Sequence, residues 1–197
     1  LSGPPGLGKT TLARIVANEI GGKLVETIGG NLQAPEQLIG LLRSLKPLDV
    51  LFIDEIHAMA RSVEEILYPA MEDGMVPVVK TESSDFMRAL GVQAKPATEM
   101  VAIPPFTLLG ASTMSGLVSA PLRSRFAHEL TLEPYSLDDL TRIVLRASKA
   151  MGVELELGVA MEVAKRSRST ARIAIGHLRW LVEYSSGLGV APDLNAV

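Results

Sequence analysis

The sequence predicts an α/β domain built on a parallel sheet, followed by a small all-helical domain. Strand and helix patterns alternate over the first two thirds of the chain, as crossover connections between parallel strands require. A glycine-rich phosphate loop stands directly before the first helix. Only helical patterns follow Pro134. We therefore expect the α/β domain in residues 1–133 and the helical domain in residues 134–197.

Each element of the α/β domain is predicted from its own pattern. The first helix has apolar residues at helical spacing and a Gly-Gly stop after Ile20. The apolar run Val50–Ile53 is typical of a strand that is buried on both faces of a parallel sheet. The predicted helices are Lys9–Ile20, Ala34–Leu45 and Val63–Met71, and the predicted strands are Leu24–Ile28, Val50–Ile53, Phe106–Gly110 and His128–Leu132.

Residues 75–103 form an irregular segment with β-rich ends and a polar middle. The valines and the isoleucine at its two ends can pair as strands, so we expect a long hairpin that projects from the domain. Phe86, Met87 and Leu90 stand between polar stretches, where a projecting tip offers no core. Exposed apolar side chains of this kind mark a partner site, and packing back on the same chain is the open alternative.

The helical domain is predicted from three amphipathic patterns, Leu137–Met151, Leu157–Arg166 and Ala171–Tyr184. The first is preceded by Ser136, with Asp139 at the spacing of a capping box. A basic run accompanies the later helices, formed by Lys165, Arg166, Arg168 and Arg172. This run is either a solvated helix face or a DNA-binding patch.

The composition excludes several classes of protein. With 47% hydrophobic and 21% charged residues, the 197-residue chain can form a core and lacks the signature of disorder. The absence of cysteine excludes disulfides and thiolate metal sites. No segment reads as a membrane span or a secretory signal, so we expect a cytoplasmic protein without a membrane partner. A net charge of −3 does not favour chain-wide attraction to nucleic acid.

The phosphate loop is the clearest chemical motif of the chain. The segment GPPGLGKT fits the pattern G-x-x-x-x-G-K-[ST]. Its glycines allow backbone N–H groups to turn towards phosphate oxygens, and the following helix adds its positive dipole end. Lys9 would reach the β- and γ-phosphates, and the Thr10 hydroxyl would hold Mg²⁺. The predicted nucleotide-binding residues here are Gly3, Pro4, Pro5, Gly6, Leu7, Gly8, Lys9, Thr10 and Thr11.

Two adjacent acids end the apolar strand in LFIDEIH. Open α/β sheets bind ligands at the carboxyl ends of their strands. Asp54 would therefore hold the hydration shell of Mg²⁺, and Glu55 would polarise the attacking water. His57 could sense the nucleotide, contact a neighbouring subunit or serve only the structure.

Three further polar residues extend this predicted site. Thr113 ends the apolar strand of LLGAST, and it could hydrogen-bond the γ-phosphate or the water. Arg125 belongs to LRSRF, where a guanidinium could bind phosphate or form a surface salt bridge. Arg172 opens a helix, where a cation opposes the helix dipole, which hints at an external anion.

The order of these motifs resembles the RuvB family of Holliday-junction branch-migration motors. GPPGLGKTTLA, DVLFIDEIH, VEEILYPAMEDG, IPPFTLLGAST and APLRSRF follow one another as in that family, and STARIA resembles its sensor-2 segment. The resemblance covers nearly the whole chain. VEEILYPAMED and PPFTLLGA narrow it to this branch of the AAA+ superfamily.

The resemblance implies an AAA+ (ASCE P-loop) core with a parallel sheet and a helical lid. It assigns Lys9 and Thr10 to Walker A, and Asp54 and Glu55 to Walker B. It makes Thr113 sensor 1, Arg125 the arginine finger and Arg172 sensor 2. It further implies a hexameric ring with the finger acting in trans, ATP and Mg²⁺ as cofactors, and duplex DNA or a Holliday junction as the substrate of an ATPase of the helicase or translocase type.

The chain departs from the family in two places. The segment between Asp73 and Pro104 is longer than the family's hairpin, which docks RuvA, and its sequence differs, so RuvA remains one possible partner. Only Leu1 and Ser2 precede the phosphate loop, and no winged-helix domain follows the lid, so we expect part of a longer protein. Two alternative functions remain open. One is a clamp-loader-like or protein-remodelling AAA+ ATPase, and the other is a scaffold that binds nucleotide without hydrolysing it.

Overall fold

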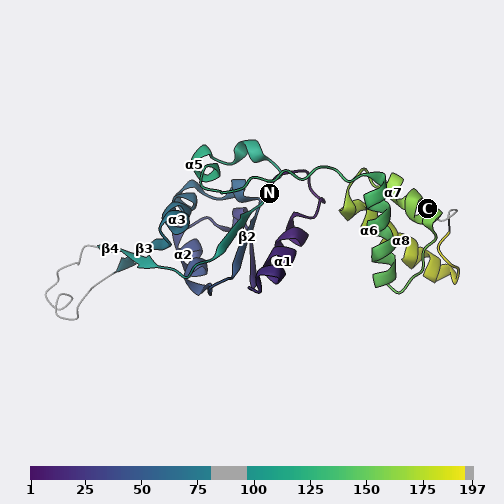
Figure 1. The fold of residues 1–197 in the computed structure, drawn as a ribbon, viewed down its shortest axis with the longest axis horizontal. Helices are drawn as coiled ribbons and strands as arrows, with labels where there is room; N and C mark the ends of the chain where they lie inside the picture. The colour runs from purple at the N-terminus through teal and green to yellow at the C-terminus, as the bar shows by residue number, and fades with distance from the viewer. Residues whose placement is uncertain (81–96, 194–197) are drawn as a thin grey trace. The chain divides into compact units, whose positions relative to one another are not determined.

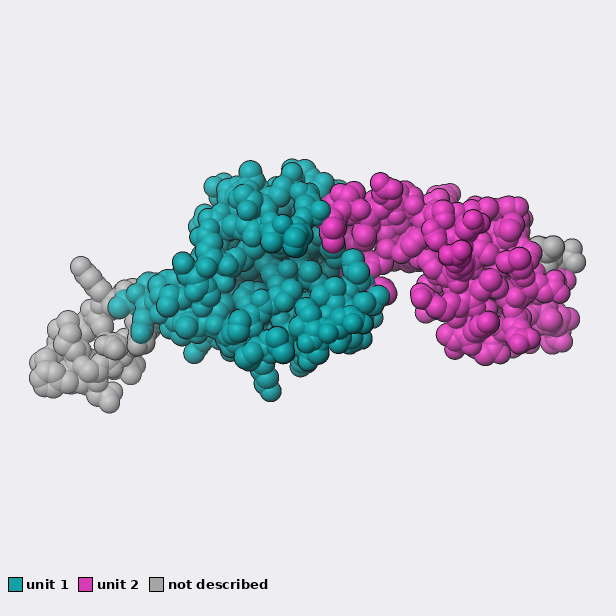
Figure 2. All heavy atoms as spheres, in the orientation of Figure 1, with its two compact units in different colours: residues 1, 12–129 teal, residues 2–11, 130–197 magenta. Residues whose placement is uncertain are grey.

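The computed structural model describes residues 1–80 and 97–193. These residues form two compact units (Figure 2). Unit 1 comprises Leu1 and Leu12–Glu129, and unit 2 comprises Ser2–Thr11 and Leu130–Val197. Each unit has a hydrophobic core of its own.

A three-stranded parallel sheet lies at the centre of unit 1, with the strand order β1-β2-β5 (Figure 1). Ile53 of the middle strand pairs with Thr27 on one side and with Gly110 on the other. The strands are β1 (Leu24–Ile28), β2 (Val50–Asp54) and β5 (Thr107–Gly110). The predictions of a parallel sheet and a buried middle strand are confirmed.

Helices cover both faces of β2 because its successive side chains point to opposite sides. Phe52 packs with Ala13 of α1, and Leu51 and Ile53 pack in the larger cluster with α2 and α3. The helices of unit 1 are α1 (Lys9–Ile20, whose first three residues group with unit 2), α2 (Pro35–Ser44), α3 (Arg61–Glu72) and α5 (Ala120–Arg123), and the 3-10 turns are Gly29–Asn31, Ile56–Ala58 and Ser115–Leu117. A sheet buried on both faces is the reason that residues 50–53 of β2 are all apolar.

The hairpin predicted for residues 75–103 is present as β3 (Met75–Lys80) and β4 (Ala97–Ala102), which pair antiparallel. Val76 and Ile103 anchor its base in the main core of unit 1. The apolar tip residues Phe86, Met87 and Leu90 lie outside the described residues. The paired arms of the predicted hairpin are therefore confirmed.

The strand predicted for His128–Leu132 is wrong. This segment makes one isolated parallel bridge, between Ser2 and Thr131. Its backbone bonds join the single residue Ser2 to Leu130 and Leu132, each at 2.8 Å. Alternation of apolar and polar residues predicted a strand here, but Leu130 is 54% exposed, so the alternation buries no face.

The helical part of unit 2 is formed by α6 (Leu137–Ala150), α7 (Leu157–Lys165) and α8 (Ala171–Leu188), which share one core. The Ser136 hydroxyl caps α6 by accepting from the Asp139 amide, as the sequence predicts. Helix α8 continues one turn past the predicted end at Tyr184 and stops where Gly189 takes a φ of +68°. No helix in the described parts of the chain is long and apolar enough to cross a membrane.

Asp49 fixes the entrance to β2. Its carboxylate accepts hydrogen bonds from the backbone amides of Lys46, at 2.8 Å, and Lys23, at 3.1 Å. The bond from the Lys46 amide, with smaller help from that of Lys23, lowers the pKa of this buried carboxyl group below its usual value. The ionised form therefore stabilises the turn from which the middle strand starts.

We expect Asp49→Asn to lower the melting temperature by a few degrees at pH 7, because the amide oxygen can accept from only one of the two backbone N–H groups and the NH₂ cannot accept from the other. A carboxyl group whose pKa is lowered on folding stabilises the fold above its unfolded pKa of about 3.9 and loses this effect as the pH falls below that value. The difference between variant and parent should therefore shrink below about pH 4. Thermal unfolding across this range tests it, with the exposed Asp73→Asn as control; a pH-independent difference would contradict the prediction.

Candidate functional site

The predicted phosphate loop has the backbone that its glycines permit. Gly3, Gly6 and Gly8 have φ values of +139°, +86° and +92°, a region that side chains with a Cβ rarely adopt. Thr10 and Thr11 follow in the first turn of α1, where backbone N–H groups have no helical acceptor. The segment is therefore shaped to present amides to an anion.

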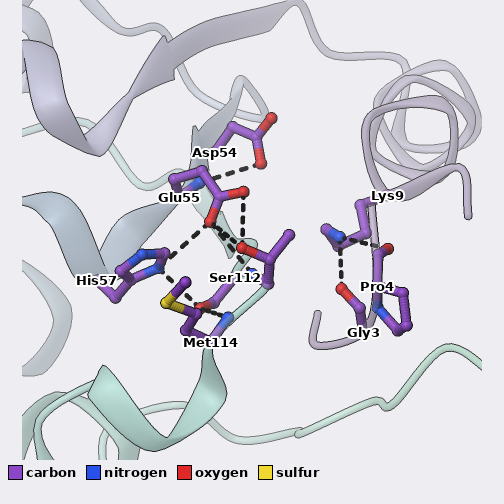
Figure 3. A network of polar contacts seen from close by, with 9 residues as sticks. Gly3, Pro4, Lys9, Asp54, Glu55, His57, Ser112 and Met114 are labelled. Atoms are coloured by element: carbon purple, nitrogen blue, oxygen red, sulfur yellow. Dashed lines mark hydrogen bonds and ion pairs between the residues drawn. The ribbon is translucent and has the colours of Figure 1, made fainter. Parts of the chain in front are cut away.

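Lys9 is directed at the carbonyl oxygens of its own loop (Figure 3). Its ammonium donates to the carbonyls of Gly3, at 2.8 Å, and Pro4, at 3.1 Å, and the residue is only 7% exposed. A buried cation needs such acceptors, because burial without them is costly. The two carbonyl acceptors therefore fix the position of the Lys9 ammonium within the phosphate loop.

Tyr135, which the sequence analysis missed, supports the same loop within unit 2. Its hydroxyl donates to the carbonyl of Leu7 at 2.9 Å, and a Cβ on Gly8 would lie 3.3 Å from that hydroxyl. Its own amide donates to the carbonyl of Ser169, in the turn before α8. The only sequence signal for Tyr135 was its place beside Pro134, where the helical patterns begin.

Arg172 lies in the first turn of α8, as predicted, and its side chain is exposed. Its backbone amide lies 3.3 Å from the carbonyl of Gly6, to which it donates. A Cβ on Gly6 would approach Arg172 Cβ to 3.0 Å and Thr170 Cβ to 3.5 Å. The start of α8 therefore packs tightly on the phosphate loop, and only glycine fits at position 6.

In unit 1, Asp54 and Glu55 stand at the carboxyl end of β2, as predicted. Glu55 takes a left-handed backbone conformation, with φ +47° and ψ +50°, which costs about 1–3 kcal/mol for a residue other than glycine. Its carbonyl is so close to Gly29 that a Cβ there would lie 2.3 Å away. Backbone strain of this kind persists where the surroundings enforce it, and functional sites are enriched in it.

The carboxylate of Glu55 is held by the end of β5 (Figure 3). The Thr113 hydroxyl donates to it, at 2.8 and 3.0 Å from the two oxygens, and the Thr113 amide lies 3.2 Å away. His57 Nδ1 lies 3.3 Å from Glu55 and 2.9 Å from the Ser112 hydroxyl. Thr113 and His57 therefore both contact the predicted base.

Arg125 belongs to a separate group of side chains in unit 1. Its Nε lies 2.9 Å from a carboxylate oxygen of Glu72, and its Nη1 donates to the carbonyl of Pro121 at 2.8 Å. Its guanidinium carbon lies 4.2 Å from the ring centroid of Tyr68. Arg123, the other arginine of this motif, bonds the carbonyl of Ser115.

Comparison with known proteins decides the family. The family model of the RuvB Holliday junction DNA helicase P-loop domain matches residues 1–132, and that of the RuvB AAA lid domain matches residues 135–187. This chain belongs to the RuvB family.

Solved RuvB structures from Thermotoga maritima are similar to this RuvB-family chain over almost its entire length. One mutant of that protein matches 99% of the chain at 39% identity, with a TM-score of 0.85. The structure described as the Holliday junction branch migration motor matches 99% at 40% identity, with a TM-score of 0.81. The chain spans 58% and 57% of these two proteins.

The structure divides the predicted residues of this RuvB-family chain into three groups, each within one unit. The phosphate loop and Arg172 belong to unit 2, with Tyr135. Asp54, Glu55 and Thr113 belong to unit 1, and Arg125 forms the third group there. Within the described residues, no three His, Cys, Asp or Glu side chains are grouped to hold a metal ion.

We expect Gly6→Ala to weaken nucleotide binding about tenfold or more, because the new Cβ meets Arg172 and the φ of +86° disfavours alanine. Titration with a fluorescent ATP analogue measures the effect. Gly176→Ala is the matched control, since Gly176 is an exposed residue inside α8 and no atom lies within 4 Å of the position that the new methyl group would take. Parental affinity of Gly6→Ala would show that the contact with the start of α8 is not limiting.

Proposed function

We propose that the chain is the ATP-binding and ATP-hydrolysing core of a ring-forming motor that translocates duplex DNA and drives Holliday-junction branch migration. The observation that carries this proposal is the match of both RuvB domains, in order, to a chain that retains the phosphate-loop lysine and the strand-end acid pair. The activity is hydrolysis of ATP to ADP and phosphate, of the helicase or translocase type. A motor of this kind acts in the recombination and repair of DNA, and we place it in the cytoplasm.

The phosphate loop binds the nucleotide in this proposal. Backbone amides of residues 6–10 contact phosphate oxygens, and the Lys9 ammonium exchanges its two carbonyl acceptors for the β- and γ-phosphates. The buried position of this ammonium supports the role, because a negative phosphate is a stronger acceptor than a neutral carbonyl. Arg172 contributes a further cation. We place the boundary between the ATPase core and the lid at residues 133 and 134.

Glu55 acts as the base that polarises the attacking water, and Asp54 holds water around Mg²⁺ together with the Thr10 hydroxyl. Bound Mg²⁺ neutralises charge on the β- and γ-phosphates. The hydrogen bonds between Thr113 and Glu55 support a shared role, because the same hydroxyl can donate to the carboxylate or turn to a phosphate oxygen. Arg125 serves a neighbouring subunit in a hexameric ring.

The RuvB match favours a DNA motor over a clamp-loader-like or protein-remodelling ATPase. The β3–β4 hairpin is the proposed docking site for a RuvA-like partner protein. By register and alternation, one hairpin face carries Met75, Pro77, Val79, Thr98, Met100 and Ala102. Val79 is 60% exposed and Met100 is 45% exposed, so this mostly apolar face exposes two large apolar side chains.

We expect Glu55→Gln to keep nucleotide affinity and to lower turnover about 100-fold or more, because the amide keeps the shape but cannot take a proton. Lys9→Ala should instead weaken nucleotide binding about tenfold or more, since it removes a charged donor. Steady-state ATP hydrolysis and nucleotide titration, measured on full-length protein, separate the two effects. Glu36→Gln, an exposed glutamate of α2, is the matched control.

Two outcomes of these measurements count against the proposal. Equal turnover by Glu55→Gln and the parent would reject the base role and favour a nucleotide-binding scaffold. Hydrolysis that neither a four-way junction nor linear duplex stimulates would reject the DNA motor and favour a remodelling ATPase that acts on protein.

For the hairpin, we expect Val79→Ser combined with Met100→Ser to lower the affinity for a RuvA-like protein about tenfold or more, because both exposed apolar side chains lose their contacts. Nucleotide affinity should stay parental. Calorimetric titration with the purified partner measures the effect, and Leu48→Ser, at a residue 58% exposed elsewhere in unit 1, is the control. An unchanged partner affinity would place the docking site off this face.

A further inference from the structure

Helix α3 carries two side chains that contact Arg125, although the sequence assigned no chemistry to this helix. Tyr68 and Glu72 are separated by four residues, so they lie on the same face of α3, one turn apart. Both come from the segment VEEILYPAMEDG, which served only to identify the family. Their shared partner is the arginine proposed to act on a neighbouring subunit.

The two side chains hold the guanidinium of Arg125 from different directions. The Tyr68 ring lies beneath its plane, with 4.2 Å between the guanidinium carbon and the ring centroid. A carboxylate oxygen of Glu72 lies 2.9 Å from Nε and forms an ion pair with it, although Nε makes no hydrogen bond. Nη1 donates a hydrogen bond to the carbonyl of Pro121 at 2.8 Å. In the part of the chain that the structure describes, no hydrogen bond or ion pair uses Nη2, and the side chain is 25% exposed. Nη2 therefore keeps its donor capacity for an anion.

Tyr68 is itself fixed in place. Its hydroxyl donates to Glu64, one turn earlier on α3, and the Ser119 hydroxyl donates to the same carboxylate oxygen. Burial, together with the bond to Glu64, raises the pKa of the Tyr68 hydroxyl, which therefore remains a protonated donor at neutral pH. Ser119 also caps α5, the short helix that leads to Arg125. The ring is therefore tied to the element that carries the arginine.

Contacts of this kind can order the arginine side chain before it meets a phosphate. A free arginine side chain samples many rotamers, and the entropy lost when it is ordered on phosphate binding weakens that binding. We propose that Tyr68 and Glu72 are positioning residues, which hold the Arg125 guanidinium so that its Nη2 edge faces the nucleotide phosphate of a second copy of this chain. The inference rests on the proposed role of Arg125.

Glu72 could also weaken the contact between Arg125 and a phosphate by neutralising the charge of the arginine, but this effect is smaller than the gain from positioning. The Glu72 side chain is 54% exposed, so water and salt screen its charge and the pair interacts weakly. The aromatic ring binds the cation without carrying a charge of its own. The guanidinium therefore keeps its charge for an incoming phosphate while its orientation is set.

The test compares two substitutions of Tyr68 in full-length, ring-forming protein. Tyr68→Leu removes the ring and should lower the kcat of ATP hydrolysis about tenfold, with nucleotide affinity and ring assembly unchanged. Tyr68→Phe keeps the ring and loses only the hydroxyl bond to Glu64, so it should retain most of the activity that Tyr68→Leu loses. Parental kcat in Tyr68→Leu, or equal losses in both variants, would overturn the inference.

Substitutions of Glu72 test the same inference in case Tyr68→Leu does not fold. Glu72 is half exposed near the end of α3, so Glu72→Ala should fold. It should lower kcat severalfold, and Glu72→Gln, which also removes the negative charge of the ion pair with Nε, should lose about as much. A kcat at or above the parental value in Glu72→Ala would overturn the role of Glu72 and show that it restrains the arginine instead.

Arg125→Ala separates failure of this inference from failure of the proposed function. If the finger role is right, Arg125→Ala subunits are inactive alone and recover activity when mixed with Glu55→Gln subunits. Adding Tyr68→Leu to the Arg125→Ala subunits should then leave the recovered activity unchanged, because these subunits have no finger to position. Full activity of Arg125→Ala would reject the finger role, and the inference with it. Recovery that falls when Tyr68→Leu is added to the Arg125→Ala subunits would reject the inference alone.

Discussion

The parallel pairing of β2 between β1 and β5 is the constraint on which the chemistry of unit 1 depends. Because both neighbours run in the same direction, their carboxyl ends meet at one edge of the sheet. Asp54 and Glu55 end β2 at this edge, and Thr113 follows β5 there. A shift of β5 by one residue would turn its side chains to the opposite face and separate Thr113 from Glu55.

Much of this arrangement could be predicted from the sequence, because it follows from local patterns. The apolar run of β2 and the glycines of the phosphate loop each specify their own geometry. The failures have a common cause in long-range contacts. The segment His128–Leu132 has an alternating pattern but finds only Ser2 as a backbone partner. Helix α8 continues past the predicted end at Tyr184 through Ser185, which is buried.

The candidate site shows the same division. The motif residues carry recognisable chemistry at recognisable spacing, so sequence alone could name them. Tyr135, Tyr68 and Glu72 carry no such signal, because each acts by contact with a residue distant in the chain. Pattern reasoning therefore finds residues that belong to motifs and misses the side chains that contact them from distant parts of the chain.

Lys9 shows how a binding loop can hold its own shape. The ammonium stands where it bridges two carbonyls of its own loop, so the turn is cross-linked from inside by a side chain. In the proposed role of Lys9, the arrival and departure of a nucleotide would exchange the acceptors of one cation, and the loop around it would not have to fold again. The same charge would then both bind the phosphate and keep the empty loop in shape.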